Sequence, residues 1–236
     1  MNHFDEAILA AREVLCFYRK FLPTLDSLNF RADIILTSIL LREKIVVDLR
    51  PLIDKFCGML TIDEYETSIL INKNHLPGKR YFTIGHELCH YFMHRDKSSH
   101  FLDHRGNLNS NSDKDTLPII EQQANAFSSE LLMPREVINA MLTNKFSFYK
   151  IAKSIKVSYE SLKWRLVRHC IETCGLNNLE SKIVVEDYMV VSKAKLHHNA
   201  AIFDIESPYV LKAITILANE YKQKQKRLFL TLKPNI

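Results

Sequence analysis

Glycine is scarce in this chain, with five glycines in 236 residues against a usual share of roughly 7%. No two of them lie closer than seven positions apart. The G-x-G-x-x-G fingerprint of dinucleotide-binding folds and the Walker A loop both need glycines closer together than that. The sequence therefore excludes a Rossmann-type cofactor site and a P-loop.

Paired cysteines and long apolar runs are also missing. The five cysteines make an odd number with no framework spacing, and no apolar run approaches the length of a membrane span. The first six residues lack the basic flank and apolar stretch of a signal peptide. We therefore expect a cytoplasmic protein with reduced thiols and no membrane partner.

The pattern along the chain predicts a helix-rich α+β protein in four parts. Residues 1–42 carry apolar side chains at helical spacing and are interpreted as an N-terminal helical extension. Residues 43–135 form the core, and residues 136–176 read as a helical segment resembling a helix-turn-helix. Residues 177–236 are interpreted as a small C-terminal α/β appendage of unknown role.

Local signals place the elements within these parts. In the core we expect a short helix at 48–56, a hairpin of strands at 59–63 and 67–72, helices at 80–94 and 117–132, and a polar loop at 96–116. In the helical segment we expect helices at 147–155 and 159–171. In the appendage we expect strands at 182–191 and 228–232, with a helix that begins at Ser207-Pro208 between them.

The segment His86-Glu87-Leu88-Cys89-His90 has the form H-E-x-x-H. Two histidines four residues apart lie on one face of a helix, close enough to hold one metal ion through their imidazole nitrogens. Glu87 is placed to take a proton from a metal-activated water as the water attacks a carbonyl. The motif therefore predicts a hydrolytic metal site with His86 and His90 as ligands.

A tetrahedral catalytic site needs a third protein ligand. The best candidate is Glu121, which opens the next predicted helix; Asn125 lies one turn later on the same face and could hydrogen-bond a ligand histidine. His94 would sit too far along the helix axis to close on the same ion. His100 and His104, in the polar loop, stay open as alternatives.

These segments resemble the ImmA/IrrE metallopeptidase family over about residues 43–175. The resemblance is carried by Arg80–Tyr91, by Glu121–Phe127 running into Glu130–Pro134, and by the stretches Val46–Leu49 and Ile69–Asn72. It implies a zincin-like core of the gluzincin type, with one Zn²⁺ per chain held by two histidines and one glutamate. These roles fall on His86, His90 and Glu121, with Glu87 as the base. Cys89 departs from the pattern, which usually has Gly or Ala there.

The resemblance further implies a narrow protein substrate, typically a helix-turn-helix repressor of the Xre type. We therefore expect a zinc metallo-endopeptidase that cleaves such a regulator. The alternative from another class is a non-catalytic metal-binding regulator, or a toxin–antitoxin component, that acts by binding DNA or protein.

The net charge of +5 is mild, but basic residues concentrate between Lys145 and Arg168, where Glu160 is the only acid. Candidate contacts to a substrate or to DNA are Lys153, Lys156, Lys163 and Arg165. Such charge suits a DNA-reading helix. We nevertheless favour packing or substrate docking, because a similar helical pair follows the peptidase core in the family that the chain resembles.

Overall fold

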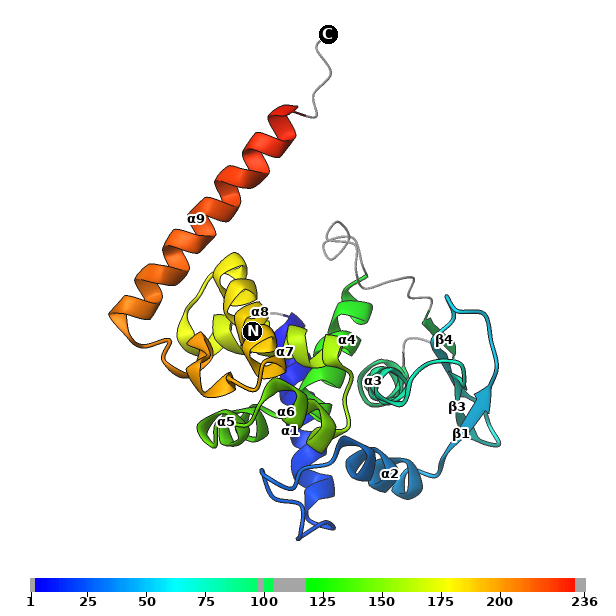
Figure 1. The fold of residues 1–236 in the computed structure, drawn as a ribbon. Helices are drawn as coiled ribbons and strands as arrows, with labels where there is room; N and C mark the ends of the chain where they lie inside the picture. The colour runs from blue at the N-terminus through cyan, green and yellow to red at the C-terminus, as the bar shows by residue number, and fades with distance from the viewer. Residues whose placement is uncertain (1–2, 97–99, 104–117, 232–236) are drawn as a thin grey trace. The chain divides into compact units, whose positions relative to one another are not determined.

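The structure is a computed structural model that describes residues 3–96, 100–103 and 118–231 (Figure 1). Helices dominate these residues, and the strands form one small sheet, so the predicted α+β, helix-rich fold class is confirmed. Among the helices of these ranges, none combines the length and the hydropathy needed to cross a membrane.

The chain divides into two compact units. The first comprises residues 1–140 with 152–162, and the second comprises 141–151 with 163–236. The elements that begin before residue 140 are α1 (His3–Arg19), α2 (Ala32–Arg42), β1 (Ile45–Arg50), β2 (Gly58–Ile62), β3 (Thr67–Asn72), α3 (Pro77–Cys89), the π-helical turn η1 (His90–His94), β4 (His100–Asp103), α4 (Ile119–Leu132) and α5 (Arg135–Thr143).

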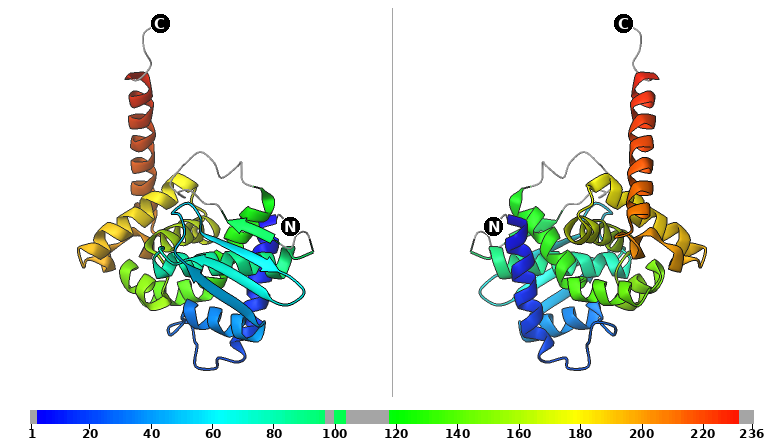
Figure 2. Two further views of the ribbon diagram at one scale, coloured as in Figure 1. Left: turned by 90° about the vertical axis from the view of Figure 1, so that its right-hand side faces the viewer. Right: turned by 90° about the vertical axis from the view of Figure 1, so that its left-hand side faces the viewer.

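The sheet of the first unit has the strand order β1–β3–β2–β4. The predicted hairpin is confirmed as β2 and β3, which pair antiparallel, whereas β1 runs parallel to β3 with Ile45 opposite Thr67. Leu60, Ile69 and Ile71 are fully buried, and α3 packs against β2 and β3. Figure 2 shows the strands side by side in its left view, and Figure 1 looks along α3, with the sheet on one side and α4 on the other. The helix that carries the motif is therefore enclosed between a sheet and a second helix.

Two expectations for this unit are wrong. The helix expected at 48–56 is absent, because Ile45–Arg50 form β1 and residues 51–57 form neither helix nor strand. Ile45, Val46 and Val47 at the start of β1 are β-branched and favour a strand, and Pro51 lacks the N–H that would extend the ladder. Residues 100–103, expected within a loop, form β4 at the edge of the sheet. Residues 97–99 and 104–117, the rest of that predicted loop, lie outside the described residues.

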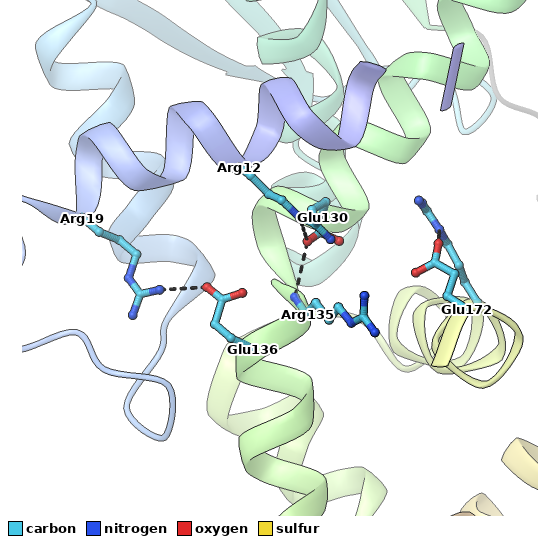
Figure 3. A network of polar contacts seen from close by, with 7 residues as sticks. Arg12, Arg19, Glu130, Arg135, Glu136 and Glu172 are labelled. Atoms are coloured by element: carbon cyan, nitrogen blue, oxygen red, sulfur yellow. Dashed lines mark hydrogen bonds and ion pairs between the residues drawn. The ribbon is translucent and has the colours of Figure 1, made fainter. Parts of the chain in front are cut away.

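The N-terminal extension packs on the core through α1, which contacts α4 along its length. Ala7 and Ala11 are fully buried one turn apart, and their small side chains let the two helices approach closely. Arg12 Nε lies 2.9 Å from Oε1 of Glu130, whose side chain is 2% exposed, so an ion pair joins α1 to α4 (Figure 3). Further along α1, Arg19 pairs with Glu136 of α5 at 2.9 Å (Figure 3).

The described residues of the second unit form helices joined by turns, with no strand among them. Besides the end of α5, the elements that lie wholly or partly in it are α6 (Phe148–Ile155), α7 (Tyr159–Cys174), α8 (Asn178–Lys193), the short 3₁₀ turns η2 (His197–Asn199) and η3 (Ala201–Phe203), and α9 (Pro208–Thr231). The two helices of the helix-turn-helix-like segment are present as predicted, and Pro208 begins α9 as predicted.

The α/β character expected for residues 177–236 is wrong. The segment 182–191 lies within α8, and residues 228–231 lie within α9. Asn177 and Glu180 form a capping box at the start of α8, and these paired caps satisfy backbone donors that a strand would leave for a neighbour. Val184 and Tyr188 are fully buried one turn apart, which gives α8 a helical inner face. The appendage is therefore a helical one in its described residues.

Candidate metal centre

The motif helix α3 begins at Pro77, whose fixed φ and missing N–H suit the first helical position. His86 and Glu87 are fully buried near its end, and His90 is 1% exposed. His90 also opens the π-helical turn η1, which the sequence did not indicate. Turns of this type are rare and occur frequently at functional sites.

A close helix contact brings α4 to the motif. A β-carbon built on Gly85 would lie 2.6 Å from Oγ of Ser128, so only glycine fits at this crossing without a shift. The Ser128 hydroxyl donates a hydrogen bond to the carbonyl of Phe82 at 2.8 Å. These contacts set α4 against α3 one residue before the first histidine of the motif.

The three side chains predicted as metal ligands converge. His86 Nε2 and His90 Nε2 lie 3.2 Å apart, and Glu121, in the first turn of α4, places Oε2 3.1 Å from His86 Nε2 and Oε1 3.4 Å from His90 Nε2. All of these candidate ligand atoms lie within 4.8 Å of one another. In a tetrahedral site with bonds of about 2.0–2.1 Å, ligand atoms are separated by about 3.3 Å. The observed separations fit one small divalent cation held by two imidazoles and a carboxylate.

The burial of the three side chains is unequal. The two histidines are almost fully buried, whereas the side chain of Glu121 is 22% exposed. A catalytic metal site needs three protein ligands and an open position. The cluster supplies three donors and is reachable from solvent on the side of Glu121.

The other two residues predicted for the site lie next to the ligands along their helices. Glu87 follows His86 on α3, and because successive helical residues are turned by about 100°, it flanks the face that carries the histidines. Asn125 is half-buried, one turn after Glu121 on α4. The roles of Glu87 as base and of Asn125 as hydrogen-bond partner stay predictions.

His94 contacts His90 on the side of its ring away from the candidate metal position. Its Nδ1 is 3.0 Å from Nδ1 of His90, and its Nε2 is 3.1 Å from Oε1 of Gln123. The Gln123 amide in turn donates to Oε2 of Glu6 at 3.3 Å. Sequence reasoning weighed His94 only as an alternative ligand and missed the other two residues. The repeated four-residue spacing of the histidines was a signal for His94, but none linked α1 to the site.

The candidate contacts in the helix-turn-helix-like segment differ in exposure. Lys153 and Lys156 are exposed, in the first unit, whereas Lys163 of the second unit pairs with Glu186 at 2.9 Å. Arg165 is 1% exposed, so the prediction of a surface contact is wrong for this residue, because its guanidinium is enclosed by the protein.

The turn between α6 and α7 keeps its shape without the usual glycine. Lys156 has a φ of 70°, the left-handed conformation that commonly ends a helix. The Ser158 hydroxyl oxygen accepts a hydrogen bond from the backbone N–H of Ser161 at 3.0 Å, and this contact caps the start of α7.

Cys89, which departs from the pattern of the resembled family, is fully buried. Its Sγ lies 3.6 Å from Sδ of Met93. A buried thiol in apolar surroundings is typically inert, which favours a packing role for this side chain. The side chains of His100 and His104, the other alternative ligands, lie outside the described residues.

Comparison with known protein families gives a match to a peptidase family. Residues 54–167 match the family model Peptidase_M78, described as the IrrE N-terminal-like domain. The matched segment contains α3, α4 and all three converging side chains, and it leaves out α1, α2 and β1. Among curated proteins, none matches the chain significantly.

Proposed function

Because residues 54–167 make this chain a member of the ImmA/IrrE peptidase family, we propose that it is a zinc metallo-endopeptidase of the cytoplasm that cleaves a specific protein substrate. The observation that carries the proposal is the convergence of His86, His90 and Glu121 within the matched segment, at separations that suit a tetrahedral ion. Family membership supports peptide-bond hydrolysis, and the donor set supports a metal.

In this proposal the chain's own residues divide the work. His86, His90 and Glu121 hold the ion, which when bound supplies Lewis-acid chemistry to the scissile carbonyl. Glu87 accepts a proton from the attacking water and delivers a proton to the leaving amine. The burial of both histidines keeps bulk water away from their side of the site, while the partial exposure of Glu121 leaves its side accessible from solvent.

We propose an Xre-type helix-turn-helix repressor as the substrate, on the strength of the family resemblance. The exposed Lys153 and Lys156 give the helix-turn-helix-like segment a basic surface that suits docking of an acidic protein face. The rival role, direct DNA binding, is weakened by the burial of Arg165 and by the ion pair that engages Lys163.

The resemblance implies a repressor from a neighbouring gene, so the test incubates this protein with a purified Xre-type repressor of that origin and follows cleavage by intact-mass spectrometry. The wild-type protein loaded with zinc should yield two fragments whose masses sum to that of the repressor plus one water. Glu87→Gln should bind zinc and fold like the wild type but yield no fragments, because an amide cannot accept the proton.

Two controls separate the possible outcomes. His86→Ala should lose both zinc and cleavage, and a chelator should abolish cleavage by the wild type. Cleavage by Glu87→Gln at the wild-type rate would refute the mechanism. A zinc-loaded wild type that leaves the repressor intact, yet shifts it or its operator DNA in a gel, would favour the non-catalytic regulator instead.

A further inference from the structure

A chain of hydrogen bonds leads from the candidate ligand His90 to the N-terminal helix. His90 Nδ1 contacts His94 Nδ1, His94 Nε2 contacts Gln123 Oε1, and Gln123 Nε2 contacts Glu6 Oε2, at 3.0, 3.1 and 3.3 Å. His94 is 1% exposed and Gln123 is 6% exposed, so the two middle links are shielded from water. Glu6 is exposed and lies on α1.

The Glu6 carboxylate determines which atom donates and which accepts in each of these hydrogen bonds. A carboxylate only accepts hydrogen bonds, so Glu6 needs the NH₂ group of Gln123 opposite it. The amide oxygen of Gln123 then faces His94 and requires Nε2 of that ring to be the donor. A neutral His94 with a proton on Nε2 has a lone pair on Nδ1, and this nitrogen therefore accepts a hydrogen bond from the Nδ1–H of His90.

The consequence reaches the candidate metal centre. With its proton on Nδ1, His90 presents an unprotonated Nε2, and this is the atom that faces His86 and Glu121. We propose that His94, Gln123 and Glu6 are positioning residues that hold His90 in the tautomer and orientation needed to bind a metal ion. Partners of this kind orient ligand histidines in metal sites generally. The inference rests on the proposed function insofar as it takes His90 as a ligand.

The packing of α1 supports this role. Ala7, next to Glu6, is fully buried, and Arg12 on the same helix is paired with Glu130 of α4. Gln123 lies on α4, two residues after Glu121, so one helix supplies both a ligand and a link of the chain. Glu6 lies outside the segment that matches the peptidase family, residues 54–167. The N-terminal helix therefore supplies a hydrogen-bond acceptor, the Glu6 carboxylate, that lies outside the matched domain.

The test compares variants of the 236-residue protein, each of which removes one link of the hydrogen-bond chain. His94→Phe removes the acceptor of the hydrogen bond from His90 Nδ1–H. Gln123→Leu removes the amide that links His94 to Glu6. Glu6→Ala removes the carboxylate that accepts from Gln123. Glu6→Gln keeps an oxygen that can accept from Gln123 and serves as the conservative rescue. The matched control is Arg12→Ala, which removes another polar contact between α1 and α4 but leaves the chain intact.

Two readouts are used, and neither depends on cleavage. The first is the Zn²⁺ dissociation constant, from competition with a chromogenic chelator at fixed pH. His94→Phe should weaken zinc binding roughly 10- to 100-fold. Gln123→Leu and Glu6→Ala should weaken it less but in the same direction, and Glu6→Gln should match the wild type. Arg12→Ala should keep the zinc affinity while lowering the melting temperature.

The second readout is the tautomer of His90 in the metal-free protein, from ¹H–¹⁵N NMR correlations within labelled imidazole rings. The wild type, Glu6→Gln and Arg12→Ala should show the proton on Nδ1. His94→Phe, and to a smaller extent Glu6→Ala, should show a mixture of tautomers. A merely structural role for these residues would change the melting temperature without changing the tautomer.

Wild-type zinc affinity and an unchanged tautomer in both His94→Phe and Glu6→Ala would overturn the proposal. If His94→Phe fails to fold, Glu6→Ala decides the test, because its side chain is exposed on the surface. Failure of the proposed function has a different signature: the wild type binds zinc but cleaves no repressor. In that case the zinc affinities and the tautomer of His90 still decide whether the hydrogen bonds from His94 to Glu6 position His90.

Discussion

The hydroxyl of Tyr91 donates a hydrogen bond to Oε2 of Glu43 at 2.8 Å, and Tyr18 donates to the other oxygen of the same carboxylate. Tyr18 lies on α1, Tyr91 lies in the π-helical turn after the motif, and Glu43 caps the end of α2. One carboxylate therefore joins three helical segments next to the candidate metal centre.

This arrangement predicts loss of stability in alkali. Burial, followed by the contact with Glu43, raises the pKa of both Tyr18 and Tyr91. A tyrosine whose folded pKa is raised contributes no pH dependence below its unfolded value of about 10, and its stabilising contribution is lost as the pH rises from there through the folded pKa. The free energy of unfolding, measured with urea, should therefore fall above about pH 10.

Tyr18→Phe and Tyr91→Phe should each make this fall less steep, since phenylalanine has no proton to lose. The control is Tyr65→Phe, because Tyr65 is 93% exposed. Curves for Tyr18→Phe and Tyr91→Phe that run parallel to the wild-type curve would contradict the prediction.

Gly85→Ala should destabilise the protein by about 1–3 kcal/mol, because the new methyl group meets the Ser128 hydroxyl in a packed interface. Ser128→Ala alone should cost about 1 kcal/mol through the lost hydrogen bond to Phe82. The double variant should recover part of the loss, since the nearest remaining atom of residue 128 would be its Cβ at 3.3 Å. A double-mutant cycle from urea unfolding measures this coupling, and strictly additive losses would argue against the clash.

Glu121→Ala should reduce zinc affinity by more than the roughly 10- to 100-fold expected for a residue that only supports a ligand. The matched control is Gln122→Ala, the next residue on α4, which should bind about one zinc per chain. A His100→Ala, His104→Ala double variant should also keep its zinc. X-ray absorption spectra that show three imidazole nitrogens on the metal would rule out Glu121 as the third ligand.

Cys174 should be a reactive thiol of the second unit. The hydrogen bond from Cys170 lowers the pKa of Cys174 to about 7, and Cys174 is only partly buried. In a Cys16→Ser background, which removes an exposed thiol, a disulfide reagent should modify Cys174 at neutral pH and leave the buried Cys57 and Cys89 intact. Cys170→Ala should move the midpoint of this reaction toward the ordinary value of about 8.5. A midpoint that stays near neutral pH would exclude the contact as its cause.

Much of the candidate site could be predicted because its signals are local. The four-residue spacing of His86 and His90 defines one helix face, and Glu121 opens a helix whose start is marked by Pro118. The distances between these side chains could not be predicted, because they depend on how closely α3 and α4 pack at Gly85. The chain from His94 to Glu6 was missed for a similar reason, since it joins residues that are far apart in the sequence.

Two of the errors in the fold involve β-branched residues that were interpreted without their partners in the fold. Ile45–Arg50 form a strand because β3 lies alongside to pair with them, and that pairing is not visible locally. Val184 and Val185 favour a strand by propensity, yet they lie in α8 because the cap at Asn177 and the buried face with Tyr188 support a helix. In α8, tertiary contacts outweighed propensity, whereas in β1 the pairing with β3 stabilises the strand that the propensity favours.

The family signature begins at residue 54, but the first unit does not. A protein shortened to the matched residues would lose β1, and β3 would become an edge strand of the sheet. Its unpaired backbone groups would promote aggregation. The shortened protein would also lose α1, which covers α4. The matched segment of this protein is therefore not an independent folding module. A chimera that exchanges it between relatives would have to include the preceding 53 residues.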